Sequence, residues 1–198
     1  ISDFSYDLAL NLTSYKNELT ALNSVAYLGI PSSSLHSINF GQEVSRSAVG
    51  QPIGAFYGYV ADGLFRSQQE VTDYGMQPNA QAGDIKFKDV NGDGIVDSKD
   101  RTFIGSPHPD VMLGFNINLK YKQFDLGMFF NGSFGNDLYN LTKYKTGFFN
   151  QSAYNKNASL LGAWTVDNPN SDIPRLSLDD RNNNIRPSSY YVEDGSYF

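Results

Sequence analysis

Strict alternation of apolar and polar residues over three long segments constrains the fold of this chain most. In residues 3–14, 111–121 and 124–133, every second side chain is apolar or aromatic, and most of those between are small or polar. Because successive side chains of a strand point to opposite faces of a sheet, the pattern predicts three β-strands, each with one apolar face. The apolar positions are Phe4, Tyr6, Leu8, Leu10, Leu12, Val111, Leu113, Phe115, Ile117, Leu119, Tyr121, Phe124, Leu126, Met128 and Phe130.

The connections between these strands differ greatly in length. Only Lys122 and Gln123 separate the second strand from the third, which predicts an antiparallel hairpin. Residues 17–110 and 134–198 are rich in Asn, Gly, Pro and Ser and hold only short apolar stretches, so we predict two long loops. Loops of this length have a function of their own. The fold class is therefore all-β with antiparallel strands, in keeping with an aromatic content of 14%.

Two architectures fit such strands. In a soluble sandwich the apolar face packs on a second sheet, whereas in a transmembrane β-barrel it contacts lipid and the polar face lines the lumen. The strands are about 10–11 residues long, near the length that a membrane strand needs and above the ~5–6 residues of a usual soluble strand. Aromatic residues at the strand ends, among them Tyr121 and Phe124, are typical of the interface girdles of barrels. The alternation itself leaves both architectures open.

Composition excludes several other classes. The chain carries 21 acidic and 15 basic residues, a net charge of −6, and its basic residues are scattered, so nucleic acid is not an expected partner. It has no cysteine and therefore no disulfide framework or thiolate site. It has no apolar run of about 18 residues, which excludes a transmembrane helix but not barrel strands.

Residues 89–100 match the pattern of an EF-hand-type calcium loop. Oxygen-bearing side chains fall at loop positions 1, 3, 5, 9 and 12, Gly94 occupies position 6, and the carbonyl of position 7 is available. The last position holds an Asp where Glu is usual, and the alternative is a turn without metal. We predict a structural rather than catalytic Ca²⁺. The expected ligands are Asp89, Asn91, Asp93, Ile95, Asp97 and Asp100.

No residue pattern supports catalysis. Ser106, His108 and Asp110 lie too close together in one Pro-containing turn to adopt the geometry of a triad. Asp179 and Asp180 adjoin an Arg and three consecutive Asn residues, so we interpret them as a solvated turn rather than a glycosidase pair. We expect no enzyme.

Five aromatic residues in the second long segment have two interpretations. Their rings either stack on sugar rings or pack the loop together, and packing is the favoured interpretation. These residues are Tyr144, Phe148, Phe149, Tyr154 and Trp164.

Several ordered segments together resemble the C-terminal part of SusC/RagA-type TonB-linked outer-membrane proteins. The order of these motifs is more specific than any single alternation or glycine pattern. The resemblance covers most of the chain from the first strand onward. It is carried by residues 50–65 (GQPIGAFYGYVADGLF), 83–94 (GDIKFKDVNGDG), 100–107 (DRTFIGSP), 131–140 (NGSFGNDLYN) and 191–197 (YVEDGSY).

The resemblance implies an active importer in the outer membrane of a Gram-negative bacterium. Such a transporter has a large barrel closed by a plug, takes energy through TonB, and works with a SusD-like surface lipoprotein to import glycans or peptides. Residues 1–198 are then expected to be a fragment of the barrel domain, with extracellular loops but without the plug, the TonB-contacting part and the final strands. The remaining alternative is a soluble calcium-binding β module for carbohydrate binding or adhesion.

Overall fold

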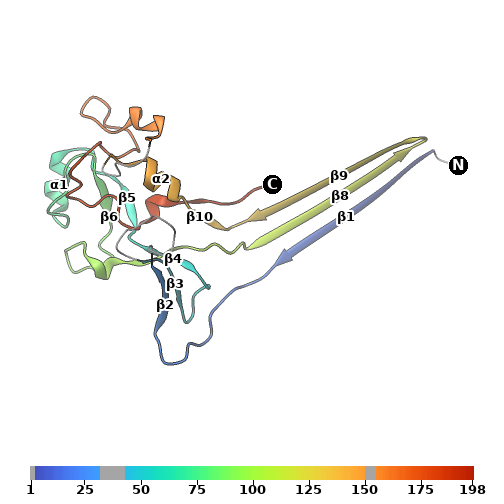
Figure 1. The fold of residues 1–198 in the computed structure, drawn as a ribbon, viewed down its shortest axis with the longest axis horizontal. Helices are drawn as coiled ribbons and strands as arrows, with labels where there is room; N and C mark the ends of the chain where they lie inside the picture. The colour runs from blue at the N-terminus through green and yellow to red at the C-terminus, as the bar shows by residue number, and fades with distance from the viewer. Residues whose placement is uncertain (1–2, 32–42, 150–154) are drawn as a thin grey trace.

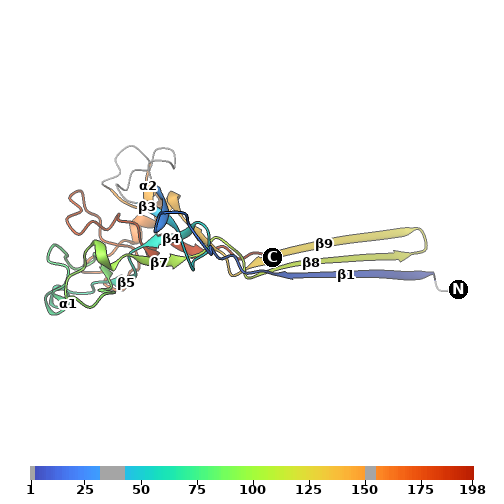
Figure 2. The same ribbon diagram turned by 90° about the horizontal axis from the view of Figure 1, so that it is seen from below.

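The computed structural model describes residues 3–31, 43–149 and 155–198, and these residues form two parts (Figure 1). One part is a long three-stranded sheet, and the other is a compact head that contains the remaining elements. Seen from below, the long sheet is a single thin layer that projects from the head (Figure 2). The long sheet consists, in spatial order, of β1 (Phe4–Ser14), β8 (Val111–Tyr121) and β9 (Phe124–Phe134).

The three long strands lie within one residue of the segments that the alternation predicts. Each has 11 residues, and both antiparallel pairings run from end to end without a bulge. Leu8 lies opposite Ile117, and Ile117 lies opposite Met128. Directly opposed residues of an antiparallel pair share a face, so the register places the apolar sides of all three strands together.

The β8–β9 hairpin closes through a two-residue turn at the tip farthest from the head (Figure 1). Lys122 adopts a positive φ of 56°, as the first residue of a hairpin turn does when its twist matches that of the strands. The backbone N–H of Lys122 also donates to the carbonyl of Asp3, with an N···O distance of 2.9 Å. The start of β1 is thereby fixed beside the turn.

The two segments predicted as long loops are folded, and in this respect the loop prediction was wrong. Short strands, two α-helices and three 3-10 turns occur in their described residues. These elements have three to seven residues, too short for alternation or helical periodicity to mark them in the sequence. They are β2 (Tyr27–Pro31), β3 (Glu43–Ala48), β4 (Ala55–Gly58), β5 (Ala61–Leu64), α1 (Gln68–Tyr74), β6 (Ile85–Phe87), η2 (Ser98–Asp100), β7 (Thr102–Gly105), β10 (Asp137–Tyr139), α2 (Leu141–Thr146), η3 (Ala158–Gly162), η4 (Ser189–Tyr191) and β11 (Val192–Asp194).

The head is held together by an aromatic core drawn from both long segments. Phe87 and Tyr191 are fully buried although they are about a hundred positions apart. Burial of such large apolar surfaces is the main term that stabilises a fold with little regular structure. The buried members of the core are Tyr59, Leu64, Ile85, Phe87, Tyr144, Phe148 and Tyr191.

Three of the five aromatic residues of the second long segment belong to this core or pack against it. Tyr144 and Phe148 are buried in it, and Trp164 packs against its rim, so packing rather than sugar stacking accounts for these three rings. Phe149 remains 43% exposed. Tyr154 lies outside the described residues.

Side-chain amides from other parts of the chain complete the hydrogen bonding of β6. Asn182 donates to the carbonyl of Ile85 at 2.9 Å, and Asn184 accepts from its N–H at 2.8 Å. Gln77 accepts from the N–H of Phe87 at 2.7 Å. Buried backbone groups need partners, and here three buried side chains substitute for a neighbouring strand. Residues 182–184 are thereby fixed against the centre of the head.

Residues 187–189 return to β4 and β5 across a position that only glycine can occupy. The N–H of Tyr59 donates to the carbonyl of Pro187, and the N–H of Ser189 donates to the carbonyl of Tyr59, both at 2.9 Å. A side chain at Gly58 would collide with the Pro187 carbonyl group. The close approach therefore explains the glycine at this place in the strand.

Candidate functional site

The apolar face of the long sheet is largely exposed on its two outer strands and partly exposed on the central strand β8. On β1, Leu8, Leu10 and Leu12 retain 55, 67 and 69% of their accessible surface, and Phe124 at the tip retains 78%. No second layer of the described residues covers this face (Figure 2). A continuous apolar surface of this kind marks contact with a membrane or with another molecule.

The dimensions of the long sheet fit a membrane. Strands of 11 residues that rise about 3.3 Å per residue are about 36 Å long. At a tilt of roughly 40° they would cross about 28 Å, close to the apolar band of an outer-membrane barrel. At the tip, Phe4 lies opposite Tyr121, and Tyr121 lies opposite Phe124, so one aromatic row ends the apolar face. Aromatic rows occur in barrels at the membrane interface.

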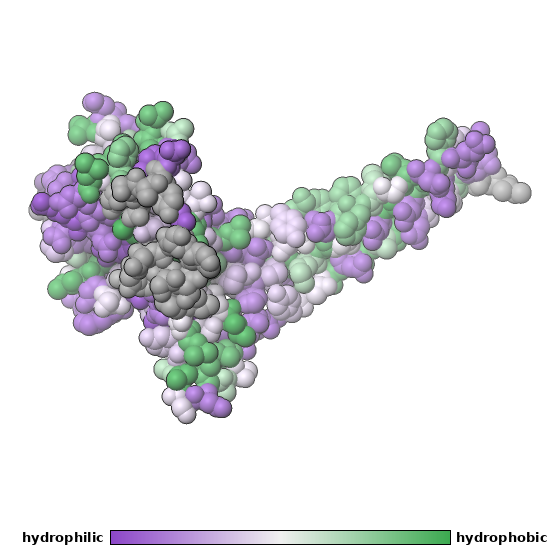
Figure 3. Space-filling model, in the orientation of Figure 1, coloured by the Kyte–Doolittle hydropathy of each residue, from purple (hydrophilic) through white to green (hydrophobic). Residues whose placement is uncertain are grey.

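Charged and polar side chains share the other face. Near the tip, Asn118 donates to Asp7 at 3.5 Å, and Lys120 lies 3.6 Å from Asp125. These groups are exposed, so the pairs contribute little to stability. In the space-filling view, hydrophilic and hydrophobic residues are both visible along the long sheet (Figure 3). The opposite faces of this sheet therefore suit opposite environments.

Toward the head, the polar face carries no charge and contains a shallow hollow of about 250 Å³. Its floor is at Gly114, which lies between Asn11 and Asn131 in the register. The next row toward the head is Thr13, Met112 and Ser133. The side chains around the floor are those of Asn11, Thr13, Met112, Asn131, Ser133 and Tyr197.

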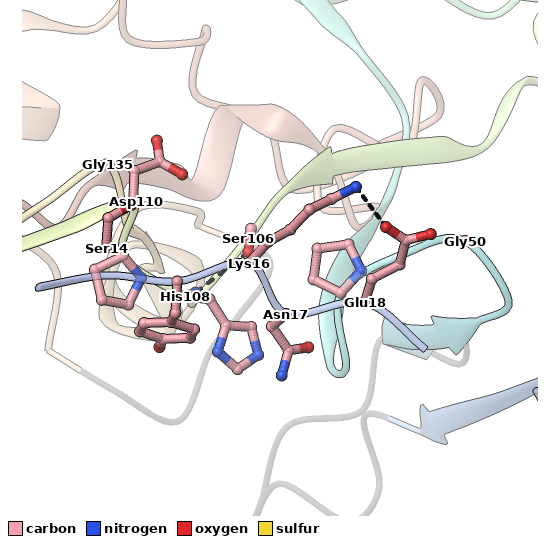
Figure 4. Close-up of a pocket in the computed structure, with 12 residues that line it drawn as sticks. Ser14, Lys16, Asn17, Glu18, Gly50, Ser106, His108, Asp110 and Gly135 are labelled. Carbon is pink, nitrogen blue, oxygen red and sulfur yellow. Dashed lines mark hydrogen bonds and ion pairs between the residues drawn. The ribbon is translucent and has the colours of Figure 1, made fainter. Parts of the chain in front are cut away.

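A larger cavity of about 560 Å³ lies where the long sheet joins the head (Figure 4). Asn17 accepts from the backbone N–H of Ile53 at 2.8 Å, and the ring of His108 donates through Nε2 to the carbonyl of the same residue at 2.9 Å. Lys16 and Glu18 pair with each other at 2.5 Å. The bond from Ile53 to Asn17 thus fastens the segment that follows β1 to the head.

The residues that resemble a triad in sequence do not form one. Ser106 Oγ accepts from the backbone N–H of His108 at 3.2 Å, while the imidazole Nε2 contacts Ile53. A nucleophile must contact the ring of its base, so this arrangement gives no activated serine.

Asp179 and Asp180 have different environments, which corrects the interpretation of both as a solvated turn. Asp179 is exposed and pairs with Arg181 at 2.6 Å. The carboxylate of Asp180 accepts from the N–H groups of Asn184 and Ile185, and burial raises its pKa. Asp180 organises the turn at residues 180–185 rather than facing a substrate.

Residues 89–100 form a tight loop whose carboxylates bind its own backbone. Asp89, at the first position, accepts from the N–H of Gly92 at 2.6 Å and from that of Gly94 at 2.7 Å. Both glycines have positive φ, which permits this curl. The bond from Gly94 is the largest of the effects that lower the pKa of Asp89. Asp100, fully buried at the last position, accepts from three backbone N–H groups of the loop.

The carboxylates of this loop do not gather into a metal-binding group. In residues 3–31, 43–149 and 155–198, no group of three or more His, Asp or Glu side chains is arranged to hold a metal ion. Lys99 lies 3.4 Å from Asp93 and 3.8 Å from Asp97, whose negative charges raise its pKa. Calcium binding by the six predicted ligands therefore stays a prediction.

The hollow and the junction cavity were not foreseen in the sequence. The hollow depends on the register of three strands, because Asn11, Gly114 and Asn131 meet only through pairing over long sequence separations. The single available signal was that Gly114 and Asn131 fall at polar positions of the alternation.

The helices of the described residues are all too short or too polar to span a membrane.

Fold and surface together define a protein whose two-faced, antiparallel sheet suits a membrane boundary. TonB-dependent receptor P26 of Formosa agariphila is 35% identical over 195 residues, which are 98% of this chain and 19% of that relative. TonB-dependent receptor SusC of Bacteroides thetaiotaomicron is 28% identical over 163 residues, 79% of this chain and 15% of its own length. The chain spans about a fifth of the length of two curated TonB-dependent receptors of Formosa agariphila that match 98% of it.

Solved structures agree on the fold. A structure of the RagAB peptide transporter matches 98% of this chain and 20% of the compared chain, with a TM-score of 0.68 and 19% identity. The chain matches no protein-family model. The chain therefore belongs to the SusC/RagA family of TonB-dependent receptors, and the resemblance identified from its motifs is confirmed over nearly the whole chain.

Proposed function

We propose that this chain forms part of the barrel wall and extracellular surface of a TonB-dependent nutrient importer in the outer membrane of a Gram-negative bacterium. The observation that carries the proposal is the unbroken register of β1, β8 and β9, which gathers apolar side chains on one face and polar side chains on the other. The apolar face would contact lipid, and the polar face would line an aqueous interior.

The two ends of the long sheet support one orientation. One end is the two-residue turn at Lys122 and Gln123, and the other end joins the head (Figure 1). Barrels of the outer membrane have short turns on the periplasmic side and longer loops outside. The head would therefore face the cell exterior.

Partners and substrates are proposed from the relatives. One curated relative is named SusC, and solved structures of the RagAB peptide transporter share the fold. A SusD-like surface lipoprotein would bind on the extracellular side, and energy would reach the barrel through TonB by way of parts outside this chain. Glycans or peptides would be the cargo.

A labelling experiment tests the membrane location. The chain has no cysteine, so single cysteines can be introduced at Ile117 on the apolar face and at Asn116 on the polar face of a receptor that contains this chain. In vesicles with quenchers attached to the acyl chains, we expect strong quenching of a fluorophore at position 117 and little at 116. Equal quenching at both sites, or none at 117, contradicts the proposal.

We further propose that residues 89–100 bind Ca²⁺ and thereby stiffen one extracellular loop. Support comes from the spacing of the oxygen ligands and from the curl at Gly92 and Gly94, which suits a calcium loop. The exposed carboxylate of Asp93 and the partly exposed carboxylates of Asp89 and Asp97 would supply charge, with the Ile95 carbonyl as a neutral ligand. The ion would be structural.

A further inference from the structure

The hollow at Gly114 lies on the face that, in the proposed function, lines the aqueous path. It occupies the part of the polar face that is nearer to the head, where cargo would first meet the wall. Its volume of about 250 Å³ is just below the roughly 300–1,000 Å³ of pockets for drug-sized ligands. A single ring-sized unit of a longer ligand fits this space better than a whole oligomer.

Three side chains around the hollow keep their hydrogen-bonding capacity. Within the described residues, the side chains of Asn11, Thr13 and Asn131 have no hydrogen-bond partner. Each Asn offers two donors and an acceptor, and Thr13 offers one donor together with acceptor lone pairs. Such a mixture matches the hydroxyl groups of a sugar, each of which both donates and accepts. A ligand with acceptors alone would leave the amide oxygens without a partner.

Charge distinguishes between ligand classes. The rows from Ala9 to Thr13, with their partners on β8 and β9, contain no charged side chain. On this face the charged side chains of the three strands, Asp7, Lys120 and Asp125, lie in the two polar rows nearest to the tip. An anionic ligand would find no cation at the hollow. An uncharged ligand needs no cation, so the uncharged lining does not weaken its binding.

Aromatic rings border the same area. Tyr197 pairs with Ser133 at the edge of the hollow and is 56% exposed, and Phe129 on the neighbouring row is 66% exposed. Phe129 is unusual because it lies among polar and small residues on the face opposite to the apolar one. Exposed rings beside amides and hydroxyls suit a ligand that has both C–H faces and hydroxyl groups.

We propose that this hollow is a subsite for one uncharged sugar unit of an imported oligosaccharide, held by Asn11 and Asn131 above Gly114 and flanked by the ring of Tyr197. The proposal rests on the proposed function, because the polar face must border the cargo. It names a neutral glycan as the cargo class at this subsite and an anionic ligand as the excluded one.

Filling the hollow tests the proposal. A side chain at Gly114 would meet only Asn11, at an ordinary contact distance of 3.8 Å, so Gly114→Gln is expected to fold. Gly127→Gln is the matched control, because Gly127 lies on the same face nearer to the tip and outside the hollow. A second variant, Tyr197→Ala, removes the flanking ring. All are made in a receptor that contains this chain.

Binding is measured by calorimetry with maltohexaose, laminarihexaose, xylohexaose and mannohexaose, and with hexagalacturonate and hexa-alanine as charged and peptide probes. We expect at least one neutral hexasaccharide to bind, and Gly114→Gln and Tyr197→Ala each to weaken its affinity about tenfold, with less than a twofold change in Gly127→Gln. The proposal fails if only hexagalacturonate or hexa-alanine binds, if no probe binds, or if the two glutamine variants behave alike. The quenching experiment at positions 116 and 117 separates such a failure from failure of the membrane location.

Discussion

Ser133 and Tyr197 exchange two backbone hydrogen bonds, with N···O distances of 3.0 and 2.9 Å. This antiparallel bridge lies on the edge of β9 that does not pair with β8. Because successive residues of extended backbone point to opposite faces, Tyr197 joins the polar face and Phe198 the apolar face, where its ring stacks on Phe130 with centroids 5.9 Å apart. The separation of the two faces thus continues beyond the three long strands.

A positive charge should be tolerated on one face of the long sheet and not on the other. Leu8 and Ala9 are neighbours near the middle of β1 but point in opposite directions. In a receptor that contains this chain, Leu8→Arg is expected to reduce the free energy of unfolding in lipid vesicles by about 2–4 kcal/mol, because it places a charge in the apolar band. Ala9→Arg should cost much less. Denaturant titration measures both, and equal costs would contradict a lipid-facing side.

The sequence predicted the long sheet well and the head poorly, for a physical reason. In β8, alternation from Val111 to Tyr121 is a local pattern, so neighbouring residues are enough to reveal the strand and its apolar face. The head depends on contacts such as that of Asn182 with the backbone of Ile85, which join residues 97 positions apart. Composition cannot indicate which asparagine side chain will bond the backbone of β6 in place of a neighbouring strand. The register that forms the hollow is equally non-local.

The buried ion pair between Arg175 and Asp84 should contribute more to the stability of the head than the exposed pair between Arg181 and Asp179. Both Arg175–Asp84 and Arg181–Asp179 have N···O distances of 2.6 Å, but the Asp84 side chain is fully buried and that of Asp179 is 71% exposed. Removing one partner of a buried pair leaves a charge without compensation, whereas exposed pairs contribute little. We expect Arg175→Met to destabilise the head by about 3 kcal/mol, and Arg181→Met to cause no measurable change.

The single tryptophan offers a way to observe this. Trp164 packs beside Gly83, whose carbonyl accepts from the backbone N–H of Arg175 at 2.9 Å, so its fluorescence reports unfolding of the head. Urea titrations of both variants are compared with the parent. An equal loss of stability in the two variants would show that burial does not determine the contribution of these pairs.

Calcium should stabilise the head if residues 89–100 bind it. Asp93→Asn removes one charge from the expected ligand set, while Asp73→Asn removes the charge of an exposed carboxylate in α1, outside the loop. With the parent we expect the melting temperature to rise on addition of Ca²⁺ and to fall with a chelator, because an ion that binds only the folded state stabilises it. Asp93→Asn should weaken Ca²⁺ affinity at least tenfold in calorimetry, and Asp73→Asn should not. If the melting temperature of the parent does not change with Ca²⁺, the calcium proposal is wrong and residues 89–100 form a turn without metal.

Alkaline pH should unfold the head through its buried tyrosines. Burial raises the pKa of Tyr190 to about 12, and it also raises those of Tyr139 and Tyr191, because a phenolate is costly away from water. A pKa that is higher in the folded than in the unfolded chain means that the stabilisation is complete below about pH 10, the usual value for tyrosine, and is lost as the pH rises toward 12. Stability is therefore expected to fall in this range.

The variant Tyr190→Phe distinguishes ionisation of Tyr190 from other causes of unfolding at alkaline pH. The substitution keeps the ring on which Lys143 lies, with Nζ 3.8 Å from the centroid, and the edge contact with Phe148. Its melting temperature at pH 7 should stay close to that of the parent, and its decline above pH 10 should be shallower, since one proton fewer is released on unfolding. Tyr15→Phe, at an exposed ring, is the control. Parallel curves for the parent and Tyr190→Phe would exclude Tyr190 as a source of the alkaline instability.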